Sequence, residues 1–147
     1  MCATVECDVH HLEVAVHLWI QGHHVERLTF DDNLTFFFDG HCELVLWSPF
    51  SLTSPPIGGR GIDHDDIDPA NVIPEQRPLF TMLGSRCAVA ECTDDGDLHM
   101  EFGDGSSIDV PADPDGPSWE LFAKRQGYAT CERSGEIRVI EHHHAAH

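Results

Sequence analysis

The chain has 147 residues, of which 41% are hydrophobic and 23% are charged, and these values are typical of one folded globular domain. Eight Lys and Arg stand against 26 Asp and Glu, and the net charge of -18 argues against direct nucleic-acid binding because phosphates would be repelled. No apolar run approaches the roughly 18 residues that span a bilayer, and no basic region followed by an apolar stretch opens the chain. We therefore expect no membrane insertion, no export and a cytoplasmic location.

Four of the six cysteines come in two closely spaced pairs, which raises the question of a metal site. Cys2 and Cys7 enclose four residues, as do Cys87 and Cys92. The segment 87–92 is predicted to be a strand, in which an odd separation places two thiols on opposite faces and not around one zinc ion. We expect reduced thiols and no cofactor, with three cysteines serving as small buried apolar residues: Cys42, Cys87 and Cys131.

Short apolar segments separated by dipeptides such as Asp39-Gly40 and Asp95-Gly96 predict a series of hairpins. The first segment, 11–20, alternates like a strand and also carries a helical stripe, and its valines favour a strand. The further predicted strands, in chain order, are Val25–Phe30, Leu34–Phe38, Glu43–Trp47, Cys87–Cys92, Leu98–Phe102, Ile108–Val110, Tyr128–Cys131 and Ile137–Ile140.

A weak internal repeat relates the first three of these strands to the next three. Gly22 and Gly84, Phe38 and Phe102, and Leu44 and Ile108 are among the residues that recur at offsets of 62 to 65, through duplication or through the turn chemistry that all meanders share. Between the two meanders, residues 48–78 hold six of the nine prolines and are predicted to be a long Pro/Gly-rich connection with one short helix around Glu75–Leu83.

The predicted fold is mainly β, with two antiparallel meanders plus a C-terminal hairpin that form a sandwich or a partly open barrel. Residues 1–141 are predicted to form a single domain with an N-terminal extension over 1–19, and residues 142–147 are a His-rich tail outside it. The residues expected to contribute to the core are Phe38, Leu46, Trp47, Leu98, Phe102, Trp119 and Ile137.

No catalytic signature is present in the sequence. Gly-x-Ser-x-Gly, His-Glu-x-x-His, phosphate-loop and dinucleotide motifs are all missing, so we do not expect an enzyme. Asp63–Asp68 packs four carboxylates into six residues, but its register does not match a calcium loop, and a solvated acidic loop is predicted. Pairs of carboxylate and imidazole, as between His99 and Glu101, are expected by chance in so acidic a chain.

The distribution of charge is the most informative feature. Nine acidic residues and no Lys or Arg lie between Glu91 and Asp115, a field that would attract a basic protein or serve only for solubility. The residues predicted to bind such a partner are Asp94, Asp95, Asp97, Glu101 and Asp104, with Asp63, Asp65 and Asp66. Phe36-Phe37-Phe38 also places apolar side chains on both faces of one strand, so the second face meets a sheet, a helix or another subunit.

From about residue 20 to residue 140 the order of motifs resembles a family of small bacterial β-rich domains of unknown function. The matching elements are Ile20–Val25 with its Gly-x-x-Val, the Asp31–Gly40 hairpin, Ser48–Leu52, the second meander ending in Val110-Pro-Ala-Asp-Pro114, Trp119-Glu120, and Gly127 to Val139. The resemblance implies no catalytic residues, because the family carries none that could be transferred.

In type, the chain is similar to the small acidic proteins that accompany toxins as immunity proteins. We therefore predict a non-enzymatic protein that neutralises a basic partner such as a toxin, a nuclease or a nucleic-acid-binding factor, in the manner of an immunity protein or a nucleic-acid mimic. The alternatives are a metal- or small-ligand-binding domain that uses His and Asp side chains, and a structural homodimer.

Overall fold

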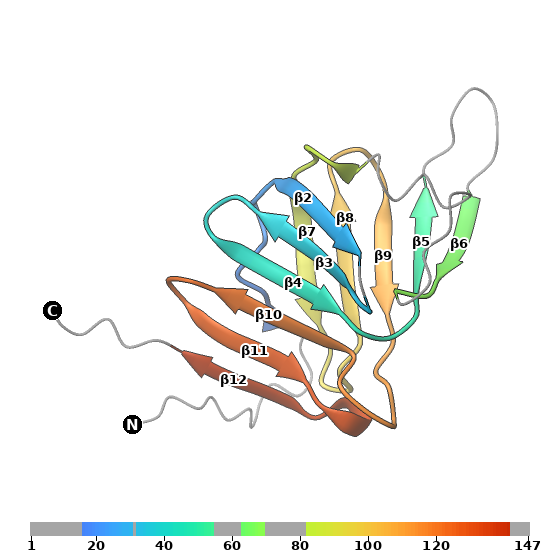
Figure 1. Ribbon diagram of the computed structural model, residues 1–147, viewed down its shortest axis with the longest axis vertical. Coiled ribbons are helices and arrows are strands. Elements are labelled where there is room, and N and C mark those ends of the chain that lie inside the picture. The colour runs from blue at the N-terminus through green and yellow to red at the C-terminus, as the bar shows by residue number, and fades with distance from the viewer. Residues whose placement is uncertain (1–15, 31, 55–62, 70–81, 142–147) are drawn as a thin grey trace, which may run out of the picture.

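The computed structural model describes residues 16–30, 32–54, 63–69 and 82–141, which form two six-stranded antiparallel sheets packed around one core (Figure 1). Sheet A has the strand order β12-β11-β10-β4-β3-β2. Its strands are β2 (Val25–Phe30), β3 (Leu34–Phe38), β4 (Cys42–Leu46), β10 (Trp119–Ala123), β11 (Gly127–Cys131) and β12 (Ile137–Glu141).

Sheet B has the strand order β1-β7-β8-β9-β5-β6. Its strands are β1 (Val16–His17), β7 (Cys87–Cys92), β8 (Leu98–Phe102), β9 (Ser107–Val110), β5 (Phe50–Ser54) and β6 (Asp63–Ile67). Between β11 and β12 the chain forms one 3-10 turn, η3 (Arg133–Gly135). A mainly β, sandwich-like fold is thereby confirmed, and it is not a closed barrel.

Strand alternation explains why these segments face one another across a core. In β4, Cys42, Leu44 and Leu46 are buried while Glu43 and Val45 lie on the other side. In β8, the same pattern buries Leu98, Met100 and Phe102. Each sheet therefore contributes one apolar face, and the two faces cover each other and are removed from water.

The strand that follows each meander along the chain belongs to the other sheet. After β4 the chain leaves sheet A, and β5 pairs with β9 in sheet B, with Leu52 opposite Ile108. After β9 the chain returns, and β10 pairs with β4 in sheet A, with Leu121 opposite Leu44. Figure 1 shows β5 and β6 on one side of the molecule and β10, β11 and β12 on the opposite side.

The internal repeat is present in three dimensions, centred on the bridge between His24 and Arg86. Around it, Gly22 N donates to Cys87 O at 2.7 Å, and Gly84 N donates to Val25 O at 2.8 Å. Both meanders also have a register shift two residues into their first strand, after Val25 and after Cys87. A shared bulge at equivalent positions is not required by turn chemistry, so the repeat favours duplication over convergence.

The bulge in β7 corrects the expectation that Cys87 and Cys92 lie on opposite faces. The extra residue resets the alternation, so both thiols point into the core, with exposures of 0% and 1%. The four described cysteines, Cys42, Cys87, Cys92 and Cys131, are buried and form no disulfide. Burial raises the pKa of Cys87 to about 12 and also raises the pKa of Cys42 and Cys131, so these thiols are held in the unreactive protonated form.

Several predictions about the central and C-terminal segments need correction. Residues 50–54 and 63–67 are strands β5 and β6, so Asp63–Asp68 is mostly an edge strand and not a loop, and 48–78 is not merely a connection. The predicted C-terminal hairpin is a three-stranded meander, because β10 joins it. Most of the short helix predicted at Glu75–Leu83 lies outside the described residues, as does the first half of the predicted strand at 11–20. In its second half Val16–His17 is strand β1.

The predicted core is correct with one exception. Phe38, Leu46, Leu98, Phe102 and Trp119 are buried, and Ile137 packs against the core while partly exposed. Trp47, by contrast, is 40% exposed, because it lies one residue beyond β4 on the side opposite Leu46.

Candidate functional site

The outer face of sheet B is lined by acidic and histidine side chains. A cross-strand row runs from Glu91 on β7 through His99, Asp109 and Ser51 to Asp66 on β6. Glu101 lies beside His99, two residues further along β8. We call these six residues the acidic face: Ser51, Asp66, Glu91, His99, Glu101 and Asp109. None of the six strands of sheet B contains a Lys or Arg.

His99 is held between two carboxylates at the centre of the acidic face. Its Nδ1 lies 2.6 Å from Asp109 Oδ1 on β9, and its Nε2 lies 2.8 Å from Glu101 Oε2. Burial of the ring opposes protonation, but these two hydrogen bonds and the two negative charges outweigh it and raise the pKa of His99. The imidazole therefore fixes both carboxylates in place while leaving the face negatively charged.

The β5–β6 hairpin extends the acidic face toward the edge of the sheet. Phe50, Leu52 and Ile67 point into the core, so Ser51 and Asp66 point outward, and Ser51 Oγ donates to Asp66 Oδ1 at 3.3 Å. Asp65 is the cross-strand neighbour of Leu52 and is half-buried on the other side of β6. The side chain of Asp63 lies outside the described residues.

The predicted partner-binding residues of the turns are not assembled into this face. Asp94, Asp95 and Asp97 lie in the β7–β8 turn, and Asp104 lies in the β8–β9 turn at the opposite end of β8. Two of them serve the local fold, because Asp97 Oδ1 accepts from Ala112 N at 3.0 Å and Asp104 Oδ1 accepts from Ser106 N at 2.8 Å. Of the predicted set, the structure brings Glu101 and Asp66 onto one surface.

Sequence reasoning missed four members of the acidic face: Ser51, Glu91, His99 and Asp109. Their signal is present in the strands, where polar residues at 99, 101 and 109 alternate with buried Leu98, Met100, Phe102, Ile108 and Val110. Counting acidic residues along the chain gave equal weight to turns and strands. Alternation would have separated the residues that share a face from those that only share a segment.

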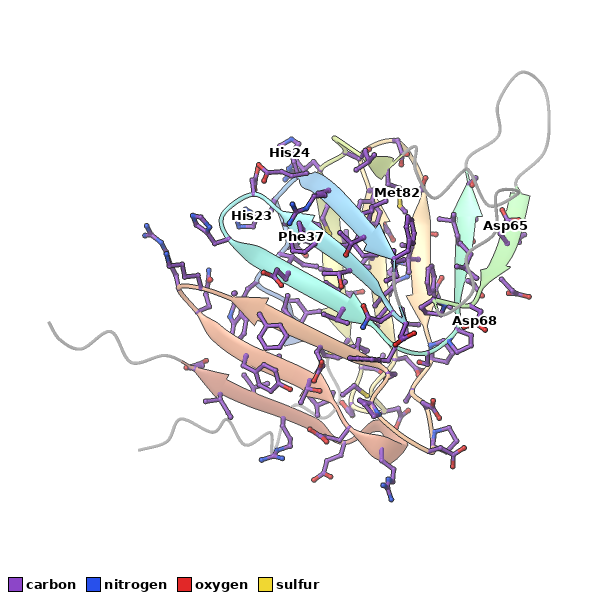
Figure 2. The ribbon with its side chains drawn as sticks, viewed as in Figure 1. His23, His24, Phe37, Asp65, Asp68 and Met82 are labelled. Atoms are coloured by element: carbon purple, nitrogen blue, oxygen red, sulfur yellow. The ribbon has the colours of Figure 1, made fainter. Side chains whose placement is uncertain are left out.

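Two further histidines, His23 and His24, contact Asp39 in the turn between β3 and β4. His23 Nδ1 lies 2.7 Å from Asp39 Oδ1 and His24 Nδ1 lies 3.4 Å from Asp39 Oδ2, and the bond with His23 is the main reason that the pKa of Asp39 is lowered. Figure 2 shows His23 and His24 on the side of the molecule away from Asp65. In the part of the chain that the structure describes, no three His, Cys, Asp or Glu side chains are arranged to hold a metal ion.

Residues 16–141 match the sequence model of a protein family that is described as a family of unknown function (DUF6188). The matched region begins with β1 and ends with β12, so it contains every described strand of both sheets. Neither the curated proteins nor the solved structures contain a match to the chain. Among the described residues, no helix has the length and hydropathy needed to cross a membrane.

Proposed function

The chain belongs to the DUF6188 family of unknown function, and we propose that it is a non-enzymatic binding protein whose acidic face captures a basic protein partner. The observation that carries the proposal is the acidic face itself, where four carboxylates project from β6, β7, β8 and β9 on a sheet whose strands contain no Lys or Arg. Such a surface repels nucleic acid and attracts cationic side chains.

The width of the acidic face suits a protein partner better than a small ligand. Five neighbouring strands, from β7 to β6, carry it, and strand spacing makes the row about 19 Å wide. Its residues are polar and lie on the outer face of a sheet, whereas small-molecule sites are typically concave and lined by apolar groups. Lys and Arg side chains of a protein could meet several of these carboxylates at once.

The hydrogen bonds within the face support binding because they reduce the entropy that a partner must remove. Glu101 and Asp109 are positioned by His99, and Asp66 by Ser51. Carboxylates held in one geometry lose less rotamer freedom when a guanidinium or ammonium group docks. Long-range attraction from the net charge of -18 would raise the association rate by about 10- to 1,000-fold at low salt.

The partner class that this chemistry fits is a basic toxin, a nuclease or a nucleic-acid-binding factor that presents its phosphate-binding surface. Blocking that surface is how an immunity protein or a nucleic-acid mimic would act. The described cysteines are buried thiols that form no disulfide, which is the state that a reducing compartment maintains and which supports a cytoplasmic site of action.

The test is affinity capture from lysate of the source cells followed by kinetics with the captured protein, using two variants that remove equal charge. The face variant carries Asp66→Asn, Glu91→Gln, Glu101→Gln and Asp109→Asn. The control carries Asp32→Asn, Asp94→Asn, Asp95→Asn and Asp115→Asn, at exposed turn positions.

We expect wild type and control to capture the same basic protein, and the face variant to lose it, with an association rate that falls steeply as salt rises. Equal losses in both variants would assign the attraction to net charge alone. Capture that survives the face substitutions would place the partner elsewhere and overturn the proposal.

A further inference from the structure

The outer face of sheet A differs from that of sheet B, because it exposes large apolar side chains. Trp47, Phe122 and Ile140 are 40%, 42% and 48% exposed. They are three of the five large hydrophobic residues found exposed in the described parts of the chain. A concentration of this kind on one sheet face marks an interaction surface more often than a solvent boundary.

Phe122 and Ile140 belong to a row of side chains in register across all six strands. A cross-strand row runs from Ile140 on β12 through Tyr128, Phe122, Glu43 and Phe37 to Arg27 on β2. A second row, one step along, contains Val45, Glu120 and Arg138. We call these residues, together with Trp47, the aromatic face. Its enrichment in Trp, Tyr, Phe and Arg is the composition of protein–protein interface centres.

Contacts within the aromatic face hold its side chains in fixed positions. Trp47 Nε1 donates to Glu120 Oε1 at 3.0 Å, and Tyr128 OH donates to Glu120 Oε2 at 2.9 Å. The Phe122 and Tyr128 rings lie 4.9 Å apart, and the Arg27 guanidinium lies 4.1 Å from the centre of the Phe37 ring. A surface ordered in this way loses little side-chain entropy on association.

Charge decides what can cover the aromatic face. It carries two cations, Arg27 and Arg138, and two anions, Glu43 and Glu120, with Glu132 lying 3.9 Å from the Arg138 guanidinium, so both signs of charge are present where the acidic face has carboxylates and no Lys or Arg. Within the described chain, neither Glu43 nor Glu120 has an ion pair with a Lys or Arg. An interface between two identical copies must be complementary to itself, and a face that carries both cations and anions around apolar side chains meets that condition.

We propose that the aromatic face is the interface of a homodimer, covered by the same face of a second copy of this chain. Two copies with a net charge of -18 repel each other least where the cations lie, and their apolar side chains leave water on contact. The two acidic faces then point outward on opposite sides of the dimer. The proposal does not depend on the function assigned to the acidic face.

The experiment is the mass of the full chain in solution, measured by light scattering and sedimentation over a wide range of concentration and salt. We expect twice the chain mass of 16.4 kDa, and tighter association at higher salt because screening weakens the repulsion. This salt dependence is opposite in sign to that expected for binding a basic partner, so failure of one proposal is distinguishable from failure of the other.

Two lysine variants locate the interface. Phe122→Lys should weaken dimerisation by about tenfold or more, whereas Leu83→Lys, at a turn residue that is 45% exposed, adds the same charge off the face and should leave it unchanged. Ile140→Lys repeats the test at an edge strand, in case Phe122→Lys does not fold by circular dichroism. A monomeric wild type, or a dimer that tolerates the folded aromatic-face variants, would overturn the proposal.

Discussion

The two halves of the molecule repeat the same strands, yet the repeat is preserved on the inner faces and lost on the outer ones. Inner positions 64 residues apart in sheets A and B hold the same kind of side chain: Leu34 and Leu98, Phe36 and Met100, Phe38 and Phe102, Leu44 and Ile108, and Leu46 and Val110. These residues fill one shared core, so a change in their volume or polarity would cost stability.

The outer positions of the same strands have diverged completely. Thr35, Phe37 and Val45 on sheet A correspond to His99, Glu101 and Asp109 on sheet B, again 64 residues apart. Packing constrains the inner face alone, and the outer face is free to take any side chain that the strand tolerates. The aromatic face and the acidic face are thus two different surfaces on one repeated scaffold, and function is to be sought in their difference.

The largest expected effect comes from removing the residues that join the two sheets. Two residues lie where the chain crosses from one sheet to the other: Trp119 at the start of β10 and Phe50 at the start of β5. Trp119 is fully buried, and its Nε1 donates to Gly96 O in the β7–β8 turn at 3.0 Å. Phe50 is 2% exposed. Trp119→Ala and Phe50→Ala should each lower the free energy of unfolding by about 3–5 kcal/mol. Urea unfolding at one fixed protein concentration measures both. A cost below that of an ordinary surface substitution would show that the sheets do not depend on these crossings.

A smaller effect is expected at the junction of the halves, where they are most alike. Gly22 and Gly84 have φ values of 96° and 87°, with open space where a Cβ would lie. Gly22→Ala and Gly84→Ala should each cost about 1–2 kcal/mol from backbone strain alone. Thermal unfolding of the two variants side by side measures whether the two substitutions lower stability by the same amount. Unequal costs would indicate that the repeat is not equivalent at its centre.

Placing the acidic residue of sheet B at the corresponding outer position of sheet A should lower the free energy of unfolding by about 1 kcal/mol. Val45 lies directly opposite Glu120, so Val45→Asp places like charges across two strands and also removes apolar contact. Val45→Asn is the matched control without the charge. The difference between the two unfolding free energies should shrink as salt rises. If Asp and Asn cost the same at all salt concentrations, charge does not limit what the aromatic face accepts.

The smallest effect concerns the pH dependence of His99. Because the folded-state pKa of His99 is raised, its contacts with Glu101 and Asp109 stabilise the protein fully below the unfolded pKa of about 6.5, and the stabilisation is lost as pH rises through the folded pKa. Stability relative to His99→Gln should therefore be greatest in mildly acidic solution. An NMR titration should show a raised pKa that falls toward normal in Asp109→Asn. A normal His99 pKa in wild type would mean that the two carboxylates do not hold the ring.

Local sequence was sufficient to find the two meanders. Their strands have clear two-residue alternation, and their turns contain glycines with positive φ, including Gly40 and Gly105, so each hairpin is specified by residues close together in the chain. It was not sufficient for β5, β6 and β10. β5 and β10 form where a distant meander offers each of them an edge, at β9 and at β4. β6 then pairs with β5 at the end of the sheet, and its sequence, DHDDI, has the charged character of a protected sheet edge.

The fold class, most of the core and the excess of negative charge follow from composition and from patterns a few residues long. The tertiary structure decided which charges meet. It placed Asp66 in line with Asp109 and Glu91 through strands that are not neighbours in the chain, and it separated Asp94 from Asp104 at opposite ends of β8. It also left Trp47 on the surface. Register between strands far apart in sequence sets these neighbours, and no local pattern encodes that register.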